Sequence, residues 1–427
     1  MALVVKNGRL INPATGEDKI CDIRIDGTKI TAIGPDVDMQ DADILDATGL
    51  VVTPGLIDMH VHLRQPGQSA KETIESGTKA AAAGGFTRVA TMPNTKPVID
   101  SAIIVDGLKY KIADEGVVKV DIIGSLSKGL EGKELSSMGG MSKAGVVAFS
   151  DDGRYVQNCD FMRKAMEYAG MFGKIVIDHC EDADLIEGGH MHEGVVSHEL
   201  GLKGRPAVAE DIAVARDILL AEATGTAVHI AHISTKNAVQ MVRQAKAKGL
   251  KVTAEATPQH MILTDEALRS YDPRFKVNPP LRSEEHRKAV VEGLVDGTID
   301  AIVTDHAPHT IEEKDCEFSL APSGFVGLET SLGTVLTYLY HAGIVDLMTL
   351  IRAMTSSPAA LLGVDAGNVA VGKAADLTIM DLNKEWTVDS DKFYSKGKST
   401  PFEAMILKGK AVATIVDGKI VMKDGEV

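Results

Sequence analysis

The sequence is poor in cysteine and has no closely spaced cysteine pair. Only four of its 427 residues are cysteines, and they lie far apart, at Cys21, Cys159, Cys180 and Cys316. Without a Cys-x-x-Cys pair, the chain offers neither a disulfide framework nor the thiolate ligands of an iron–sulfur cluster or a zinc knuckle. Any metal ion must therefore be held by nitrogen and oxygen ligands.

Excess positive charge and long apolar runs are absent as well. The formal net charge of -15 disfavours nucleic acid and other polyanions as partners. No apolar run reaches the roughly 18 residues that span a bilayer. Residues 1–16 lack the basic start, apolar stretch and cleavage site of a secretory signal. We therefore expect no nucleic-acid partner, no membrane partner and a cytoplasmic location.

Both ends of the sequence have the texture of short β-strands. Residues 1–53 and 363–427 alternate apolar and polar side chains and are interrupted by turn dipeptides such as Asn-Gly and Asp-Gly. Two small domains and a single β-sandwich built from both ends are both compatible with this pattern. We predict the composite β-sandwich.

Between these ends, residues 54–362 alternate compact apolar runs with segments of helical periodicity. The runs are GLIDMHVHL, GFTRVATM, VKVDIIGS, GVVAFSD, KIVIDHC, AVHIAHIS, KVTAEATP and DAIVTDH. Eight strand–helix units in about 300 residues are typical of a (β/α)8 TIM barrel, an α/β fold. A doubly wound open sheet is the alternative, but no Gly-rich phosphate fingerprint follows the first run, which disfavours it.

Polar side chains that can bind a metal collect where these runs end, which is the catalytic rim of such a barrel. On an extended strand, His60 and His62 project from the same face. The later runs add further histidines and carboxylates at their ends, namely Asp151, Asp152, His179, His232 and Asp305. Four histidines and at least two carboxylates make six nitrogen and oxygen ligands, which exceed the needs of one tetrahedral ion and fit two ions, for which zinc is the best candidate.

Other histidines are expected to have no part in this site. His190, His192 and His198 lie in a Gly-rich connection and are predicted to be loop or surface residues. His229, three residues before His232, should face the other way on a regular strand and have a structural role.

The motifs PGLIDMHVHLRQPG, GGFTRVATMPNTKPVID, FSDDG, DHCED, HIAHIST, KVNPPLR, TDHAPH and GFVGLET together resemble those of the cyclic amidohydrolases. The closest resemblance is to the bacterial dihydroorotases of the zinc-dependent barrel type (class I), and it runs along nearly the whole chain. It implies two zinc ions per chain: His60, His62 and Asp305 hold one, His179 and His232 hold the other, and Asp152 and a hydroxide bridge them. Asp305 is also the implied catalytic residue, which transfers the proton.

The fourth run distinguishes this chain from neighbouring families. Dihydropyrimidinases and hydantoinases bridge their metals with a carboxylated lysine near this point, whereas the sequence here is AFSDDG. An aspartate can bridge directly. Adjacent residues of a strand face opposite ways, so residue geometry leaves Asp151 and Asp152 both open, and the resemblance selects Asp152.

The resemblance also implies a small acidic substrate, whose carboxylate suits the planar fork of Arg64. The implied substrate contacts are His62, Arg64, Asn94, Asn278, His309, Ser323 and Gly324. The implied reaction is the reversible cyclisation of N-carbamoyl-L-aspartate to L-dihydroorotate and water in pyrimidine (UMP) biosynthesis. The alternatives are a hydantoinase-like or allantoinase-like enzyme and an inactive scaffold for aspartate carbamoyltransferase. A homodimer, an association with that transferase, and a lid formed by residues 310–324 all stay open.

Overall fold

Eight parallel strands form the central sheet of the computed structural model, which describes residues 2–427. The sheet runs in the order β6, β7, β8, β9, β10, β13, β14 and β15. Beyond β15, a bridge between Val61 and His306 returns to β6, where the His62 N–H donates to the His306 carbonyl at 2.8 Å. The sheet therefore closes into the predicted barrel. Its strands are β6 (Leu56–Val61), β7 (Phe86–Thr91), β8 (Lys119–Gly124), β9 (Ala148–Phe149), β10 (Ile175–Asp178), β13 (Val228–Ile230), β14 (Val252–Ala256) and β15 (Ala301–Ile302).

A helix follows each barrel strand, and polar side chains start several of these helices. Thr73 accepts from the Ser76 N–H in a capping box, and Asn158 and Thr235 accept from N–H groups three residues on. The helices are α1 (Ile74–Ala83), α2 (Ala102–Glu115), α3 (Met138–Ala144), α4 (Cys159–Gly170), α7 (Val208–Thr224), α8 (Lys236–Ala247), α10 (Glu284–Val295) and α12 (Ser331–Val335). Their apolar faces and the outer faces of the strands form the largest hydrophobic core.

Shorter helices and strands lie in the loops at the rim and at the end of the barrel domain. An excursion between β10 and α7 contains α5 (Ala183–Ile186), β11 (Met191–His192), α6 (Val195–Leu200) and β12 (Gly204–Arg205). The other short helices are α9 (Pro258–Ile262), α11 (Ile311–Lys314), α13 (Leu347–Ala353) and α14 (Ser356–Leu362). There are also 3-10 helices at Lys128–Leu130, Asp265–Ser270, Pro273–Phe275 and Ser390–Lys392 and a π-helix at Leu336–Tyr340.

Within residues 2–427, no helix combines the length and apolar composition needed to cross a membrane.

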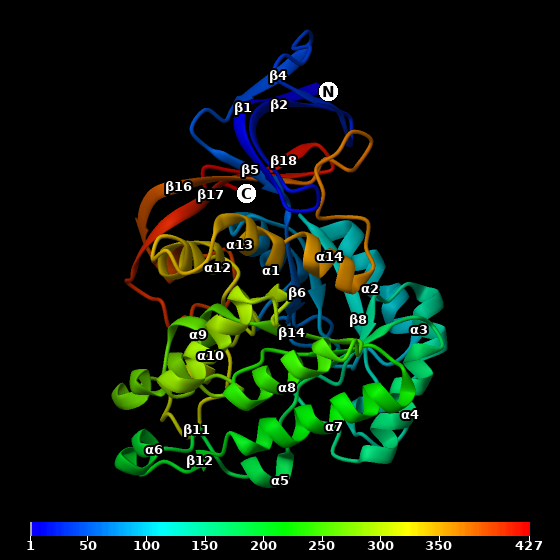
Figure 1. Cartoon of the computed structure of the whole chain (residues 1–427), viewed down its shortest axis with the longest axis vertical. Helices are drawn as coiled ribbons and strands as arrows, with labels where there is room; N and C mark the ends of the chain where they lie inside the picture. Colours follow the sequence, from blue (N-terminus) through cyan, green and yellow to red (C-terminus); the bar gives the residue numbers. More distant parts are fainter. Residues whose placement is uncertain (1) are drawn as a thin grey trace.

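The two ends of the chain share a second sheet, drawn in blue and red above the barrel in Figure 1. β16 pairs with β5 through contacts such as Leu377 with Pro54, which joins the two ends. The strands are β1 (Ala2–Asn12), β2 (Glu17–Asp26), β3 (Lys29–Gly34), β4 (Ala42–Asp46), β5 (Val51–Pro54), β16 (Leu377–Thr387), β17 (Ile406–Val416) and β18 (Lys419–Lys423).

This second sheet packs around its own hydrophobic core, which includes Leu10, Ile25 and Leu377. The pairing of both ends agrees with the predicted composite fold. The boundaries drawn at 1–53, 54–362 and 363–427 stay predictions, and Met1 lies outside the described residues.

Candidate metal and substrate site

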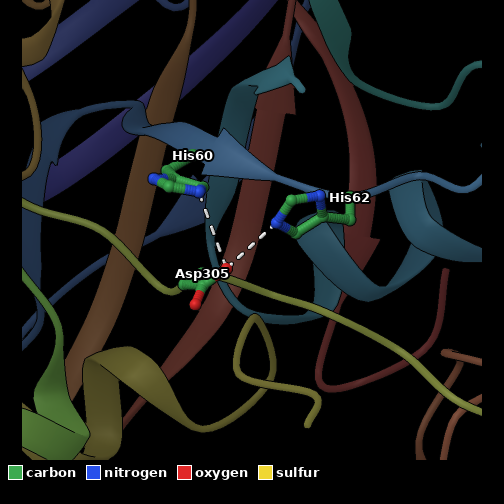
Figure 2. A group of neighbouring side chains, drawn as sticks. All are labelled: His60, His62 and Asp305. Atoms are coloured by element: carbon green, nitrogen blue, oxygen red, sulfur yellow. Dashed lines mark hydrogen bonds and ion pairs between the residues drawn. The ribbon is translucent and has the colours of Figure 1, made fainter. Parts of the chain in front are cut away.

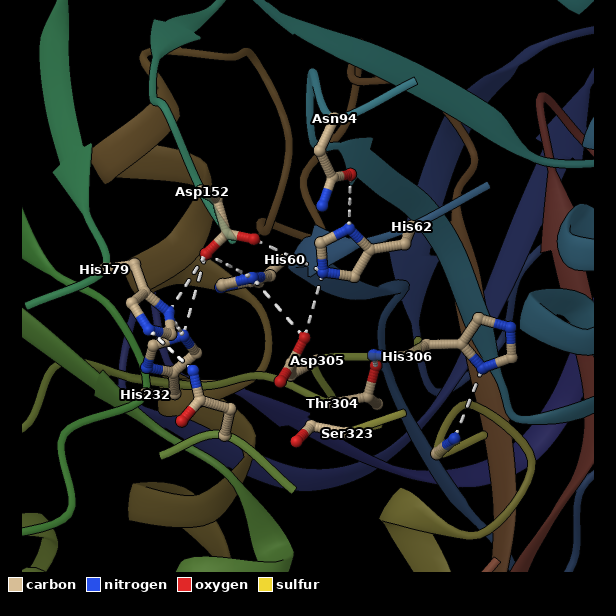
Figure 3. Close-up of polar contacts among 12 residues, drawn as sticks. His60, His62, Asn94, Asp152, His179, His232, Thr304, Asp305, His306 and Ser323 are labelled. Carbon is tan, nitrogen blue, oxygen red and sulfur yellow. Dashed lines mark hydrogen bonds and ion pairs between the residues drawn. The ribbon is translucent and has the colours of Figure 1, made fainter. Parts of the chain in front are cut away.

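A cavity of about 210 Å³ opens where the barrel strands end. Every site residue predicted from the sequence lines it except His60, which is fully buried beside the other predicted ligands. The lining residues are His62, Arg64, Asn94, Asp152, Gly153, His179, His232, Asn278, Asp305, Ala307, His309, Ser323 and Gly324. Side chains separated by more than 200 positions therefore meet in one small space, as Figure 3 shows.

His60 of the first barrel strand and His62, just after it, converge on Asp305, which follows the last strand. His62 Nε2 lies 3.0 Å and His60 Nε2 lies 3.6 Å from Asp305 Oδ1, as drawn in Figure 2. These three side chains bring one ligand atom each to a common point, a grouping that can hold a metal ion.

Asp152 lies between this group and the remaining histidines. Its Oδ1 is 3.4 Å from His60 Nε2, 3.6 Å from His232 Nε2 and 3.7 Å from His179 Nδ1. Its Oδ2 is 3.5 Å from His62 Nε2. The carboxylate thus faces both halves of the cluster.

Asp151 points away from the cavity. Its carboxylate accepts from the N–H groups of Leu126 and Ser127 at 2.8 and 3.0 Å and from the Ser127 hydroxyl. Of the two adjacent aspartates, only Asp152 faces the histidines, which is the orientation that the resemblance implied.

Strained backbone places several of these side chains. Arg64, His232 and Asp305 have φ values of 61°, 30° and 50°, in the left-handed region that residues other than glycine rarely adopt. Such conformations cluster at functional sites because the surrounding structure must hold them.

Electrostatics favour an ionised carboxylate at the centre of the cluster. Burial favours the neutral form of Asp152, but its interactions with His60, His179 and His232 together outweigh it and hold the pKa of Asp152 well below its usual range. The pKa of Asp305 is also lowered: burial raises it, but the hydrogen bond with His62 and the electrostatic attraction of the nearby histidines together outweigh burial.

Two unpartnered atoms test whether the cluster fits a cation. His60 Nε2 and Asp152 Oδ1 are buried, face each other and have no hydrogen-bond partner within residues 2–427. A buried polar atom left unsatisfied costs about 1–3 kcal/mol. A metal ion bound between a histidine nitrogen and a carboxylate oxygen satisfies both atoms, so the residues fit the group that the sequence predicted.

The outer nitrogens of three histidines have partners of their own. His60 Nδ1 lies 2.5 Å from Glu255 Oε1, and His62 Nδ1 lies 2.8 Å from Asn94 Oδ1. His179 Nε2 lies 3.0 Å from the side-chain nitrogen of Asn278 and 3.5 Å from Glu181 Oε2. Asn94 and Asn278, predicted as substrate contacts, therefore also contact histidines of the cluster.

The remaining predicted substrate contacts, Arg64, His309, Ser323 and Gly324, also line the cavity. Arg64 Nε donates to the Pro308 carbonyl at 3.1 Å, which leaves the terminal nitrogens of the guanidinium for a ligand. His309 Nε2 lies 2.9 Å from the Ser323 carbonyl. Burial, reinforced by the positive charge of Arg64 and two lysines, lowers the pKa of His309 to about 3, so this imidazole is neutral.

Three charged residues near the cluster were not predicted from the sequence: Glu181, Arg205 and Glu255. Arg205 Nη1 donates to Glu181 Oε2 at 3.0 Å and to Asn278 Oδ1. Glu255 is fully buried near the C-terminal end of β14. Glu255 could have been found from the sequence, because it is a charged residue inside the apolar run KVTAEATP. Arg205 lies in the excursion, where no sequence pattern indicates a role for it.

The other histidines agree only in part with prediction. His229 is buried and bonded to Thr253 and Glu255, in keeping with a structural role, and His198 is exposed. The prediction for His192 is wrong. It lies on β11, is 6% exposed and contacts Arg282 at 3.4 Å, because the excursion folds back over the barrel rim and covers it.

Two family models match the chain. The model described as "Dihydro-orotase-like" matches residues 49–238, and the model described as "Amidohydrolase family" matches residues 332–422. The first match contains five of the six predicted metal ligands, all except Asp305.

Solved structures share the architecture. The L-hydantoinase from Arthrobacter aurescens has a TM-score of 0.91 and 28% identity, with 100% of this chain and 97% of that chain covered. The dihydropyrimidinase from Brevibacillus agri has a TM-score of 0.89 and 24% identity, with coverages of 100% and 96%, and shows the same fold.

Curated relatives match almost the full length. A protein named dihydroorotase from Pelotomaculum thermopropionicum is 53% identical over 424 residues, which cover 99% of both chains. One of the same name from Geobacter metallireducens is 51% identical over 424 residues, which cover 99% of this chain and 100% of the relative. With half of its residues identical to theirs along nearly its whole length, this chain belongs to the dihydroorotase family of the amidohydrolases.

Proposed function

We propose that this chain is a zinc-dependent dihydroorotase, which interconverts N-carbamoyl-L-aspartate and L-dihydroorotate plus water in pyrimidine synthesis. The observation that carries the proposal is a buried arginine, Arg64, in the same cavity as a cluster of four histidines and two aspartates. The cluster suits hydrolysis or formation of an amide, and the arginine selects a carboxylate on the substrate.

The proposed ligand set divides the cluster between two zinc ions. His60, His62 and Asp305 would hold one, His179 and His232 would hold the other, and Asp152 would serve as a ligand to both. In support, the two carboxylate oxygens of Asp152 face different histidines, as the distances above describe. When bound, two such ions activate water and polarise the carbonyl of the substrate amide.

The chain's own residues bind the substrate and move its proton. Arg64 and Asn94 hold the ring carboxylate, with further contacts from His62, Asn278, His309, Ser323 and Gly324. Asp305 carries the proton to and from the ring nitrogen as general acid and base. Its position on the cavity wall, 3.0 Å from His62 Nε2, supports this assignment.

Two alternatives are less well supported. A hydantoinase-like or allantoinase-like enzyme needs no partner for a ring carboxylate, whereas Arg64 lies in this cavity. An inactive scaffold for aspartate carbamoyltransferase has no use for buried carboxylates and imidazoles, which are costly to bring together without a cation. The curated relatives named dihydroorotase favour the main assignment over both.

Metal analysis combined with turnover tests the proposal. Purified protein should contain two zinc ions per chain and hydrolyse dihydroorotate in preference to hydantoin, dihydrouracil and allantoin. Protein that binds zinc but prefers an uncharged ring would support the hydantoinase alternative. Protein without metal or activity would support the scaffold.

We also propose a cytoplasmic location, which is supported by free thiols at the exposed Cys159 and Cys316, because such thiols persist in a reducing compartment. A homodimer and a complex with aspartate carbamoyltransferase are the two assemblies to test. Light scattering of the protein alone and with added transferase measures both.

A further inference from the structure

A chain of hydrogen-bonded polar side chains runs through the barrel interior below the candidate metal cluster. It consists of Glu255 and Thr253 on β14 and His229 on the neighbouring β13. Glu255 and His229 are completely buried. Polar groups in a barrel interior are costly unless each is hydrogen-bonded, so their pairing needs to be followed atom by atom.

Glu255 lies at the centre of this chain and contacts a predicted metal ligand. Its Oε1 lies 2.5 Å from His60 Nδ1 and accepts from the His232 backbone N–H at 3.3 Å. Its Oε2 lies 3.1 Å from His229 Nε2, and His229 Nδ1 lies 2.8 Å from Thr253 Oγ1. Thr253 reaches a second cavity at the opposite, N-terminal end of the strands.

One assignment of hydrogens satisfies every contact in this chain. The Thr253 hydroxyl donates to His229 Nδ1, and His229 Nε2–H donates to Glu255. His60 Nδ1–H donates to the other oxygen of Glu255. His60 then has its proton on Nδ1 and a lone pair on Nε2, the atom that faces Asp152 and Asp305 at 3.4 and 3.6 Å.

The four histidines of the cluster differ in the partner of the ring nitrogen that faces away from the cluster. Only His60 has a carboxylate oxygen within 3 Å of the nitrogen that faces away from the cluster. His62 meets the amide oxygen of Asn94 there, and His232 Nδ1 is buried without a partner. A carboxylate behind a histidine fixes its tautomer and ring orientation and makes the opposite nitrogen a stronger ligand.

We propose that Glu255 is a positioning residue that holds His60 in its metal-binding tautomer and orientation, and that His229 and Thr253 hold Glu255 in place. This inference rests on the proposed role of His60 as a zinc ligand. It assigns a function to a residue that contacts neither the substrate cavity nor the reacting atoms. The chain Thr253–His229–Glu255–His60 therefore links the packing of the barrel interior to the strength of one half of the metal site.

The inference predicts a selective loss of one zinc ion. Glu255→Gln keeps the shape and one acceptor oxygen but removes the charge. We expect it to weaken the zinc ion at His60 and His62 by about 10- to 100-fold and to leave the ion at His179 and His232 nearly unchanged. Thr253→Val, at the far end of the chain, should weaken the same ion by a smaller factor.

Competition with a chromophoric chelator measures both zinc affinities, and cadmium-113 spectra of substituted protein report each ion separately. Glu255→Gln should shift one of the two resonances. The matched control is Glu210→Gln, which alters an equally buried glutamate that pairs with Arg282 at 3.3 Å and does not contact the cluster. This control should retain both affinities and both resonances.

The outcomes separate this inference from the proposed function. Wild-type protein that binds no zinc would overturn both. Wild-type protein with two zinc ions, together with a folded Glu255→Gln variant of unchanged affinity and spectrum, would overturn the positioning role alone. If Glu255→Gln does not fold, Thr253→Val, which retains the carboxylate of Glu255, provides the test instead. A shift of the resonance of the ion at His60 and His62 would support the inference, and an unchanged spectrum would overturn it.

Discussion

Asp305 and His62 meet across the seam at which the barrel closes, with 3.0 Å between Asp305 Oδ1 and His62 Nε2. One side chain follows the last strand and the other follows the first. A carboxylate in this position contacts the ligand cluster and borders the cavity at the same time. A proposed ligand that also transfers a proton can be tested by removing its basicity while keeping its shape.

Asp305→Asn should retain metal and lose activity in both directions. The amide oxygen still fills the ligand position, but it cannot take up the proton, and general acid–base catalysis contributes about 10²- to 10⁴-fold. Assays of ring opening and ring closure, with metal content measured on the same sample, check this. Asp151→Asn is the matched control, since that buried aspartate faces Leu126 and Ser127, and it should remain active. Near-wild-type turnover of Asp305→Asn would show that Asp305 does not transfer the proton.

Arg64→Ala should raise KM selectively for substrates with a carboxylate. Hydrogen bonds to charged groups contribute about 1.5–3 kcal/mol, which corresponds to a loss of about 10- to 100-fold in kcat/KM for dihydroorotate. Dihydrouracil, which has the ring without the carboxylate, is the internal control and should react as slowly as before. An equal loss with both substrates would mean that Arg64 supports the fold of the rim instead of recognising the carboxylate.

Two buried lysines should determine the rigidity of the wall that bears Ser323 and Gly324. Lys314 Nζ donates to the carbonyls of Pro322 and Gly324 at 3.0 and 2.9 Å, and Lys276 Nζ donates to those of Phe318 and Ser319 at 2.8 and 2.9 Å. These bonds favour a fixed wall over a mobile lid for residues 310–324.

Lys314→Met removes two of these bonds while keeping the aliphatic stem. We expect KM for dihydroorotate to rise by up to about 30-fold, since two hydrogen bonds of about 1 kcal/mol each are lost, and proteases to cut residues 310–324 faster. Lys133→Met, at a side chain that is 80% exposed, is the control. Unchanged KM and unchanged proteolysis would mean that the wall does not depend on Lys314.

Glu329 should make the stability of the chain depend on pH. Burial raises its pKa from 4.5 to about 7, against the N–H groups of Tyr394 and Ser395 and the charge of Lys398, while nearby Glu72 raises it further. A carboxyl group whose pKa is higher in the folded state stabilises the fold below pH 4.5, and this contribution is lost as pH rises through 7. The loss amounts to about 3 kcal/mol.

Glu329→Gln removes this titration. Urea unfolding of both proteins from pH 4.5 to 8 should show wild type losing about 3 kcal/mol relative to the variant. A constant difference across this range would show that Glu329 does not titrate there.

Local sequence patterns predicted most of the barrel, because each apolar run is a strand whose end is marked by the polar residues that follow it. All eight runs are strands, and the histidines and aspartates at their ends meet in one cavity. The face of Asp152 followed from family resemblance, since alternation alone does not say which of two adjacent residues points inward.

Contacts between distant segments were the part that the patterns missed. Glu255 lies in the middle of a run, where only its partner on another strand, His60, gives it a role. His192 and Arg205 lie in the excursion after β10, and they contact Arg282 and Asn278, which are more than 70 positions away. Pairings of this kind depend on which distant segments the fold brings together, and hydrophobic periodicity does not specify this.

The sheet shared by both ends has a consequence for the order in which the chain can fold. β5 leads directly into β6, which bears His60, and the Leu56 N–H donates to Thr378 Oγ1 at 3.1 Å. β5 has no neighbour on its β16 side until residues 377–380 have left the ribosome. The strand that bears His60 is thus supported by nearly the last segment to be synthesised, so this support forms only when translation is almost finished.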